Sequence, residues 1–361
     1  MSIVNANIVN PVSGTTVTVN GVPVSSPATN NVAIGVGNLQ SLTTGTNNTV
    51  VGNGSGSGLT SGSSNISLGA GALLSTTTAS DNVAVGTGSL TTNTIGQRNV
   101  AIGKWALRDN TSGSSNVAIG HHAMRSGGGQ TNVAIGYQAL FNGTGSSNVA
   151  LGRDSLVLNT TGAFNTAVGA EAGKGLTTGS SNVLLGYNSG SALTTGFTNV
   201  FLGNFAASFN SGDIFVGNNN IAIGYLSNPS TLNVDNEITL GNSSHTVLRC
   251  AVTTITSLSD ERDKKEIKPL QVGADFVKTL KPVEFIWDER DENGKHNIKD
   301  FGFIAQDLKR AQEDINLQDT LKLVYEENPE KLEASYGKLV PILVKAIQEL
   351  TERLELIEKK Q

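Results

Sequence analysis

Ser259 and Lys264 are the residues whose types and spacing best suit covalent chemistry. A serine hydroxyl becomes a nucleophile at neutral pH only beside a base. A lysine serves as that base when burial lowers its pKa and leaves it neutral. The two residues are five positions apart in the segment 259–267, so their side chains can meet on a bent chain. The segment also fits a helix start, with Ser259 as N-cap and acidic residues in the first turn. The residues alone leave both interpretations open.

The composition of the chain changes at the same place. Of the 42 Gly residues, 38 precede residue 259, whereas only 7 of the 25 Lys and Arg and 7 of the 30 Asp and Glu do so. Residues 1–258 therefore carry no formal net charge, and residues 259–361 carry the whole net charge of −5. A neutral region gives no reason to expect a nucleic-acid partner, because phosphates require clustered Lys and Arg.

Several other functional classes are not expected from the sequence. No apolar run is long enough to cross a bilayer, so we expect no membrane insertion. The first residues lack the basic start and apolar stretch of a secretory signal, which predicts synthesis in a cytoplasm without a cleavable signal. The lone Cys250 cannot form an intrachain disulfide, and we interpret it as a small apolar residue. We expect no cofactor and no metal.

A repeated Asn–apolar–Ala–apolar–Gly unit dominates residues 30–250. Its closing glycines recur every 17 residues, or every 16 in two places, from Gly35 to Gly203. Three less regular copies follow, ending at Gly217, Gly224 and Gly241. The two apolar residues around each Ala face one side of a strand, and the Ala faces the other. Gly adopts backbone angles that other residues avoid, so it suits a sharp corner after each strand.

Each unit is interpreted as one coil made of a strand, a corner, a shorter strand and a turn. A second apolar position recurs eight residues after the Asn, at Leu39, Leu73, Leu90, Leu107, Met124, Leu140 and Leu156. Stacked coils pair their backbones about 4.8 Å apart. A flexible linker, the alternative for a Gly/Ser/Thr-rich stretch, has no need of such phasing. A single coil encloses little apolar volume and would leave its Ala face bare, so we expect three copies to pack these faces around a common axis.

The repeats resemble the head repeats of trimeric autotransporter adhesins, which form left-handed β-rolls in three-chain bundles. The unit of 17 residues is longer than is usual in that family. We recognise neither the secretory signal nor the membrane β-barrel of those adhesins in the sequence. The resemblance therefore implies the repeat architecture but not the secretion pathway.

Four ordered sequence blocks lie in residues 259–361. They are Ser-Asp-x-Arg-x-Lys-x-x-Ile at 259–267, Leu-Lys-Pro-Val-Glu-Phe at 280–285, Phe-Gly-Phe-Ile-Ala-Gln at 301–306 and the closing segment 336–350. The blocks resemble the intramolecular chaperone auto-processing domain that ends phage tailspikes and fibres such as endosialidase, and that also occurs in myelin regulatory factor. The resemblance implies a single-turnover cleavage of the bond between Leu258 and Ser259. Ser259 would attack the preceding carbonyl, with Lys264 as general base.

Three further residues are auxiliary candidates under this resemblance. Asp260 and Arg262 match the motif without an assigned role, and ordinary helix-start charges are the alternative for both. A histidine assists processing in related chains, which makes His296 a candidate because it lies just before the third block. An exposed loop histidine is the alternative for His296.

The end of the chain carries an apolar stripe at helical spacing. Its members are Leu339, Leu343, Ile347, Leu350, Leu354 and Ile357. The spacing is of heptad type. Nearby charged residues lie off the stripe and are expected in solvent: Glu349, Glu352, Arg353 and Glu355. Two to three heptads are short for an independent coiled coil, so we expect the helix to assist a trimer built elsewhere in the domain. A helix packed on its own domain is the alternative.

The sequence thus predicts a mainly β protein with four parts. Residues 1–29 form an attachment or cap segment with a strand or hairpin around Asn20-Gly21. Residues 30–250 form a trimeric stacked β-roll of about 17-residue coils, and residues 251–258 form a junction. Residues 259–361 form a small α+β chaperone domain that ends in a coiled-coil-like helix.

The predicted function is that of a virion tail fibre or spike whose terminal domain drives trimerisation and folding of the shaft and then cleaves itself off. The expected partners are two further copies of the chain, other virion tail proteins and a host-surface glycan or protein. One alternative is a surface adhesin or fibre with a non-cleaving trimerisation domain. Another is a polysaccharide-degrading enzyme, which needs paired carboxylates in a groove, although only 7 acids are spread over the first 258 residues.

Overall fold

The computed structural model describes residues 17–19, 22–25, 30–210, 212–245, 247–249, 259–288, 296–326 and 328–360. Contacts divide the chain into two compact units, Met1–Asn242 and Ser243–Gln361. We call them the solenoid unit and the C-terminal unit and treat each by itself. Cys250 and Leu258 lie outside the described residues.

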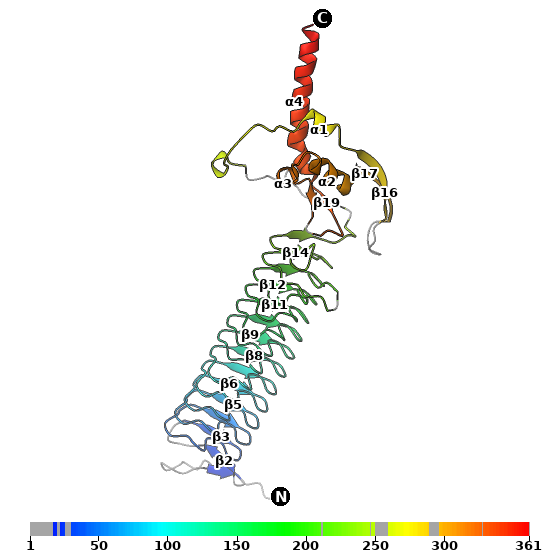
Figure 1. Ribbon diagram of the computed structural model, residues 1–361. Coiled ribbons are helices and arrows are strands. Elements are labelled where there is room, and N and C mark those ends of the chain that lie inside the picture. Colours follow the sequence, from blue (N-terminus) through cyan, green and yellow to red (C-terminus); the bar gives the residue numbers. More distant parts are fainter. Residues whose placement is uncertain are drawn as a thin grey trace. The chain divides into compact units, whose positions relative to one another are not determined.

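The solenoid unit is a stack of coils whose strands form one parallel sheet of 13 strands in sequence order (Figure 1). The strands are β3 (Val32–Ile34), β4 (Thr49–Val51), β5 (Ile66–Leu68), β6 (Val83–Val85), β7 (Val100–Ile102), β8 (Val117–Ile119), β9 (Val133–Ile135), β10 (Val149–Leu151), β11 (Thr166–Val168), β12 (Val183–Leu185), β13 (Val200–Leu202), β14 (Ile221–Ile223) and β15 (Ile238–Leu240). Equivalent residues pair directly, as Ala101 does with Ala118. The predicted β-solenoid of about 17-residue coils is confirmed.

The Ala residue in the middle of a strand faces the inside of the coil. Ala101 and Ala118 are fully buried, whereas Ile102 is 38% and Ile135 39% exposed. The expectation of a bare Ala face is therefore wrong. Most strands carry a small residue at this inward position, and the residues on either side of it are left outside. Strands β12 and β13 carry fully buried Leu184 and Phe201 there, with Gly173 and Gly190 against Leu184. We call the first and third residues of strands β3–β15 the Val/Ile stripe.

The second apolar position of each coil lies in a turn and not in the shorter strand that we expected. Leu90, Leu107 and Met124 have φ of 49° and are fully buried. A left-handed residue cannot continue a strand. The left-handed residue turns the chain so that its side chain enters the core beside the buried Ala residues. Its backbone still pairs with the next coil. The amide of Leu107, for example, donates to the carbonyl oxygen of Ala123 at 3.1 Å.

The Asn that opens each unit forms a buried ladder along the solenoid. Asn99 Oδ1 accepts a hydrogen bond from the backbone N–H of Asn116 at 3.0 Å, and Asn99 Nδ2 donates to the carbonyl oxygen of Gly113 at 2.9 Å. Both Asn side chains are fully buried. The ladder satisfies polar groups of the corner that neither strand nor turn can pair, which a buried backbone requires. The sequence showed the recurrence of this Asn but not its role.

The copy expected to end at Gly217 is not a strand of the sheet. Strand β13 pairs directly with β14, so the ladder step from Asn199 to Asn220 spans 21 residues. Asp213 occupies the Asn position of the expected copy, and a carboxylate has no N–H with which to continue the ladder. The segment lies on another side of the coil, where buried Phe215 forms an isolated parallel bridge with Leu193.

An antiparallel strand pair precedes the first coil. Its strands are β1 (Val17–Val19) and β2 (Val22–Ser25). This agrees with the strands expected near Asn20-Gly21, although those two residues lie outside the described ones. The role of residues 1–29 stays a prediction.

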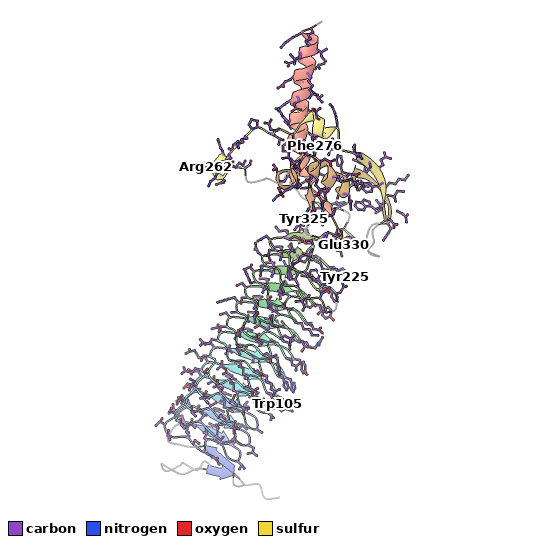
Figure 2. All side chains as sticks on the ribbon, viewed as in Figure 1. Trp105, Tyr225, Arg262, Phe276, Tyr325 and Glu330 are labelled. Atoms are coloured by element: carbon purple, nitrogen blue, oxygen red, sulfur yellow. The ribbon has the colours of Figure 1, made fainter. Side chains whose placement is uncertain are left out.

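The C-terminal unit combines short helices with small antiparallel strand pairs. Its elements are η1 (Glu261–Asp263), α1 (Ala274–Val277), β16 (Pro282–Asp288), β17 (His296–Phe303), α2 (Ala305–Glu313), α3 (Gln318–Leu321), β18 (Val324–Tyr325), β19 (Glu333–Ala334), η2 (Tyr336–Lys338) and α4 (Leu339–Glu358). Its core joins residues from the helices and their connections, Leu308 and Phe276 among them; Phe276 is labelled in Figure 2. In the parts of the chain that the structure describes, no helix has the length and apolarity needed to cross a membrane.

Helix α4 buries a different face from the one that the sequence stripe indicated. Leu339, Ile342 and Ala346 are buried, whereas Ile347 is 63% and Leu354 56% exposed. The first turns of α4 thus pack on their own domain, as the alternative had it, while most of the predicted stripe is left uncovered.

Glu349 is not the solvated residue that we expected. Its Oε2 accepts a hydrogen bond from the backbone N–H of Ala274 at 2.8 Å, at the first residue of α1. A side chain on Gly273 would meet this carboxylate, since a Cβ there would lie 2.4 Å from Glu349 Oε2. Glu349 therefore joins α1 to α4 and satisfies an N–H group that a helix start leaves free.

Candidate functional site

The structure brings Ser259 and Lys264 together. Lys264 Nζ lies 2.6 Å from Ser259 Oγ and 3.1 Å from the Ser259 carbonyl oxygen. The short helix η1 lies between them and shortens the span of the chain, so that side chains five positions apart meet. A lysine nitrogen in contact with a serine hydroxyl is the arrangement that a Ser–Lys nucleophile needs.

The helix-start interpretation belongs to Asp260 and not to Ser259. Asp260 is the N-cap of η1, and its carboxylate accepts from the backbone N–H of Arg262 at 2.9 Å. The same carboxylate accepts from Arg262 Nη2 at 2.6 Å, and these hydrogen bonds lower the pKa of Asp260. Asp260 and Arg262 thus hold the turn, as their alternative had it. Ser259 is left without the capping role and its hydroxyl faces Lys264.

Residues 259–269 are exposed in the single chain. A lysine acts as a base at neutral pH when it is desolvated. The isolated C-terminal unit does not provide that desolvation for Lys264. The two side chains are therefore in contact, but the segment around them lacks the burial that would activate Lys264 as a base.

His296 lies at the start of β17, in the strand pair formed with β16. Its Nδ1 is 2.9 Å from Asp288 Oδ1, and its side chain is 37% exposed. The contact fixes the ring next to a carboxylate of the neighbouring strand. An auxiliary role for His296 in processing stays a prediction.

Three of the four sequence blocks meet in one place within the C-terminal unit. Val283 pairs with Gly302 across β16 and β17. The hydroxyl oxygen of Tyr336, from η2, accepts from the backbone N–H of Phe303 at 3.0 Å, and the two rings pack edge to face with centroids 5.8 Å apart. A Cβ on Gly302 would lie 2.5 Å from the Tyr336 hydroxyl, so this glycine permits the approach. The role of Tyr336 as the link between blocks was not evident from the sequence.

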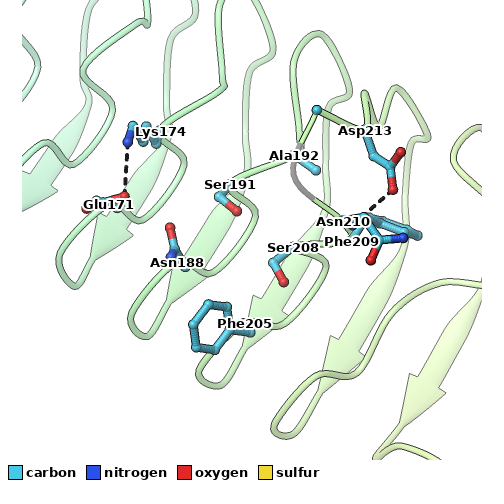
Figure 3. A pocket seen from close by; sticks show the side chains of 11 residues that line it. Glu171, Lys174, Asn188, Ser191, Ala192, Phe205, Ser208, Phe209, Asn210 and Asp213 are labelled. Atoms are coloured by element: carbon cyan, nitrogen blue, oxygen red, sulfur yellow. Dashed lines mark hydrogen bonds and ion pairs between the residues drawn. The ribbon is translucent and has the colours of Figure 1, made fainter. Parts of the chain in front are cut away.

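The solenoid unit has a cleft of about 310 Å³ beside the turns of strands β11–β13 (Figure 3). Two carboxylates line it, Glu171 and Asp213, which raises the alternative of glycan hydrolysis. Hydrogen bonds from Lys174 at 3.0 Å and from Arg153 lower the pKa of Glu171. A general acid of a glycosidase needs a raised pKa. Asp213 accepts from the backbone N–H of Asn210 at 2.9 Å. The cleft therefore gives no support to hydrolysis.

Among the described residues, no group of three or more His, Cys, Asp and Glu side chains is arranged to hold a metal ion. The family model of a peptidase described as the chaperone of endosialidase matches residues 259–317. The match begins at Ser259 and includes Lys264, β16, β17 and α2, so this segment of the C-terminal unit is similar to that chaperone family. Residues 336–350 lie beyond the match. No curated protein and no solved structure matches the chain.

Proposed function

We propose that this protein is a trimeric virion fibre or spike whose C-terminal domain assembles the β-solenoid shaft and then cleaves itself off between Leu258 and Ser259. One observation carries the proposal. The chaperone family match starts at Ser259, and the hydroxyl of this serine lies 2.6 Å from Lys264 Nζ.

The cleavage uses this pair of residues and one water molecule. Neutral Lys264 takes the hydroxyl proton of Ser259 as Oγ attacks the carbonyl carbon of Leu258. The Leu258–Ser259 amide bond breaks, the Ser259 nitrogen leaves as an amine after receiving a proton, and Leu258 is held as an ester on Oγ. Water then hydrolyses the ester, which frees the Leu258 carboxylate and restores the hydroxyl. Each chain performs the reaction once.

Because the segment around Lys264 is exposed in a single chain, the proposed cleavage depends on assembly. Neighbouring copies would cover this segment in a trimer and exclude water from the lysine. Desolvation of a lysine favours its neutral form, which is the form that acts as a base. A chain that has not assembled is expected to keep its junction intact.

Two uncovered apolar surfaces support the trimer. The Val/Ile stripe presents in-register rows of branched side chains, with Val32 40% and Ile34 42% exposed. Helix α4 presents a second row, in which Leu350 is 52% exposed. Extended exposed apolar patches mark interaction surfaces. The Val/Ile stripe takes the place of the Ala face as the surface that three shafts would pack around a common axis.

A terminal chaperone domain would prevent a specific misfolding of the β-solenoid shaft. Neighbouring coils are nearly alike, so three chains can pair one coil out of register. A domain that trimerises first raises the local concentration of the shafts and fixes their relative phase. Cleavage afterwards removes the domain that guided assembly. The shaft would then have to unfold and refold without that domain, which favours kinetic stability.

Intact mass under denaturing conditions tests the proposal directly. The wild-type protein is expected to give fragments of 258 and 103 residues, and Ser259→Ala is expected to stay at 361 residues while still forming trimers. If wild-type trimers stay uncut, self-cleavage is wrong and the domain is a permanent trimerisation tail, the second candidate. The exposure of Lys264 favours that candidate. If the protein sediments as a monomer, the assembly role fails as well.

A further inference from the structure

Aromatic and cationic side chains gather on one edge of the solenoid unit, on the turns that follow β7, β8 and β9. We call this group the Trp105 patch. It consists of Lys104, Trp105, Arg108, His121, His122, Arg125 and Tyr137. The rings succeed one another coil by coil. The centroid of Trp105 lies 6.0 Å from that of His121, and His121 is stacked on Tyr137 at 5.6 Å with an interplanar angle of 6°.

The position of Trp105 depends on the small residue one coil earlier. The first four coils carry Gly where this coil carries Trp105, as at Gly88. A Cβ on Gly88 would lie 2.7 Å from Trp105 Cδ1, so the absence of a side chain lets the indole lie over the preceding coil. The backbone of Trp105 has φ of 61°. A large residue at a left-handed position costs free energy that a glycine there does not.

The patch is positively charged within a shaft that is neutral as a whole. Lys104 Nζ lies 4.2 Å from the centre of the Trp105 ring, and Arg125 lies 5.9 Å from it. Asp109 forms an ion pair with Arg108 at 2.6 Å and lies 3.6 Å from Arg125. Three cations against one carboxylate leave two positive charges in excess.

The pKa of His122 is affected by the same excess positive charge. Burial lowers the pKa of His122, and His121, Arg125, Arg108 and Lys104 lower it further. Both ring nitrogens of His122 are shielded from solvent and have no hydrogen-bond partner within the part of the chain that the structure describes. The edge therefore combines unused polar groups, excess positive charge and aromatic faces.

We propose that the Trp105 patch binds an acidic polysaccharide, a chain of sugar rings that carry carboxylate or sulfate groups. Arg and Lys side chains form charge-assisted hydrogen bonds with such anions. The negative faces of aromatic rings attract the polarised C–H bonds on the face of a sugar ring. The patch places at least one ring on each of three successive coils along the solenoid axis, which suits a linear polymer of rings better than a single small anion.

The charge pattern favours a sugar chain over the other polyanions. Nucleic acid requires an extended basic track that neutralises many phosphates, and here the three cations of the patch lie on two coils. An acidic peptide would use the cations but not the ladder of flat rings. The exposed face of Tyr137, 48% accessible, continues the platform beyond the cations. Trp105 and the exposed Tyr225 lie on the same side of the shaft in Figure 2.

Binding of full-length protein to immobilised polymers tests the inference. The probes are hyaluronate, polygalacturonate and dextran sulfate, with uncharged dextran and polyglutamate as references. At least one acidic polysaccharide is expected to bind more tightly than both references. Trp105→Gly, which restores the residue of the earlier coils, is expected to weaken this binding about tenfold, the loss of one well-packed ring. Arg125→Gln is expected to weaken it as well and to reduce its salt dependence.

Two matched variants serve as controls. Phe164→Ala removes an aromatic ring that is 66% exposed, and Arg98→Gln removes a cation, both on other turns of the shaft. Both are expected to bind as wild type. The inference is overturned if no acidic polysaccharide exceeds the references, or if Trp105→Gly and Phe164→Ala bind alike. It is also overturned if Trp105→Gly changes the sedimenting species, which would make the patch a contact between copies. The same measurements in the Ser259→Ala variant separate this test from self-cleavage, because polysaccharide binding by the patch does not require cleavage.

Discussion

Asn116 donates two hydrogen bonds to the same oxygen of Asn99, one coil earlier. Its backbone N–H lies 3.0 Å and its Nδ2 3.2 Å from Asn99 Oδ1. This relationship recurs along the shaft, as from Asn82 to Asn99. The ladder aligns every coil at one fixed point, and the strands, corners and buried Leu rows take their register from it.

Removing one step of the ladder should weaken the shaft locally. In Asn116→Ala, a buried N–H of the next coil and the carbonyl oxygen of Gly129 lose their side-chain partner. Leaving buried polar groups unpaired costs about 1–3 kcal/mol each. Amide hydrogen exchange of the flanking coils is expected to accelerate while distant coils change little, because a solenoid transmits stability mainly between neighbours. Ser112→Ala, on an exposed turn, is the control; equal exchange in both variants would contradict a structural role for the ladder.

The corner glycine tolerates no side chain, whereas a turn glycine in the same coil does. A Cβ on Gly120 would lie 2.4 Å from the carbonyl oxygen of Gly136, and its φ is 135°. Gly120→Ala is expected to destabilise the shaft by roughly 2–4 kcal/mol. For Gly128, nothing lies within 4 Å of the added Cβ, so Gly128→Ala is expected to be neutral. Thermal unfolding of the two variants checks the difference, and a similar loss in both would argue against close stacking at the corner.

The repeat was enough to predict the coils because the phased Gly and the alternating triplet each have one physical interpretation. It was not enough to predict which face is inside. The triplet alone does not indicate how wide the coil is. The width depends on left-handed turns around residues such as Leu107, and no sequence pattern predicts the positive φ at these residues. The spacing allowed Ser259 and Lys264 to meet, and the family resemblance favoured that pairing over a capping serine. The choice of Asp260 as N-cap depended on backbone angles.

Helix α4 offers a way to separate assembly from folding. Ile347 is 63% exposed in the single chain, whereas Ala346 beside it is 4% exposed. Ile347→Asp is expected to abolish trimers, and with them self-cleavage, while the C-terminal unit stays folded by circular dichroism. Ala346→Asp buries a charge in the core and is expected to unfold the unit. Glu352→Ala, off the stripe, is the neutral control, and trimers that survive Ile347→Asp would remove α4 from the interface.

Lys264 can be tested as a base with a substitution that keeps a long basic side chain at this position. Arginine is too basic to lose its proton in a protein. Lys264→Arg therefore places a permanent cation beside Ser259 and supplies no base, and it is expected to slow cleavage at least about a hundredfold. Lys265→Arg, the adjacent change, is expected to cleave normally. Intact mass over time measures both, and normal cleavage by Lys264→Arg would mean that the residue only orients the serine.

His122 should make the stability of the shaft depend on pH. Its pKa is lowered in the folded protein by burial and then by His121, Arg125, Arg108 and Lys104, so the unfolded chain takes up the proton more readily. The stability that neutral His122 contributes is present above its unfolded pKa of about 6.5 and is lost as the pH falls from there through the folded pKa. The melting temperature is expected to fall between about pH 7.5 and about pH 5, and less so in His122→Gln. An acidic polysaccharide bound at the patch would offset the local positive charge and narrow the difference between the two proteins. Equal pH dependence in wild type and His122→Gln would show that the cations of the patch do not act on this ring.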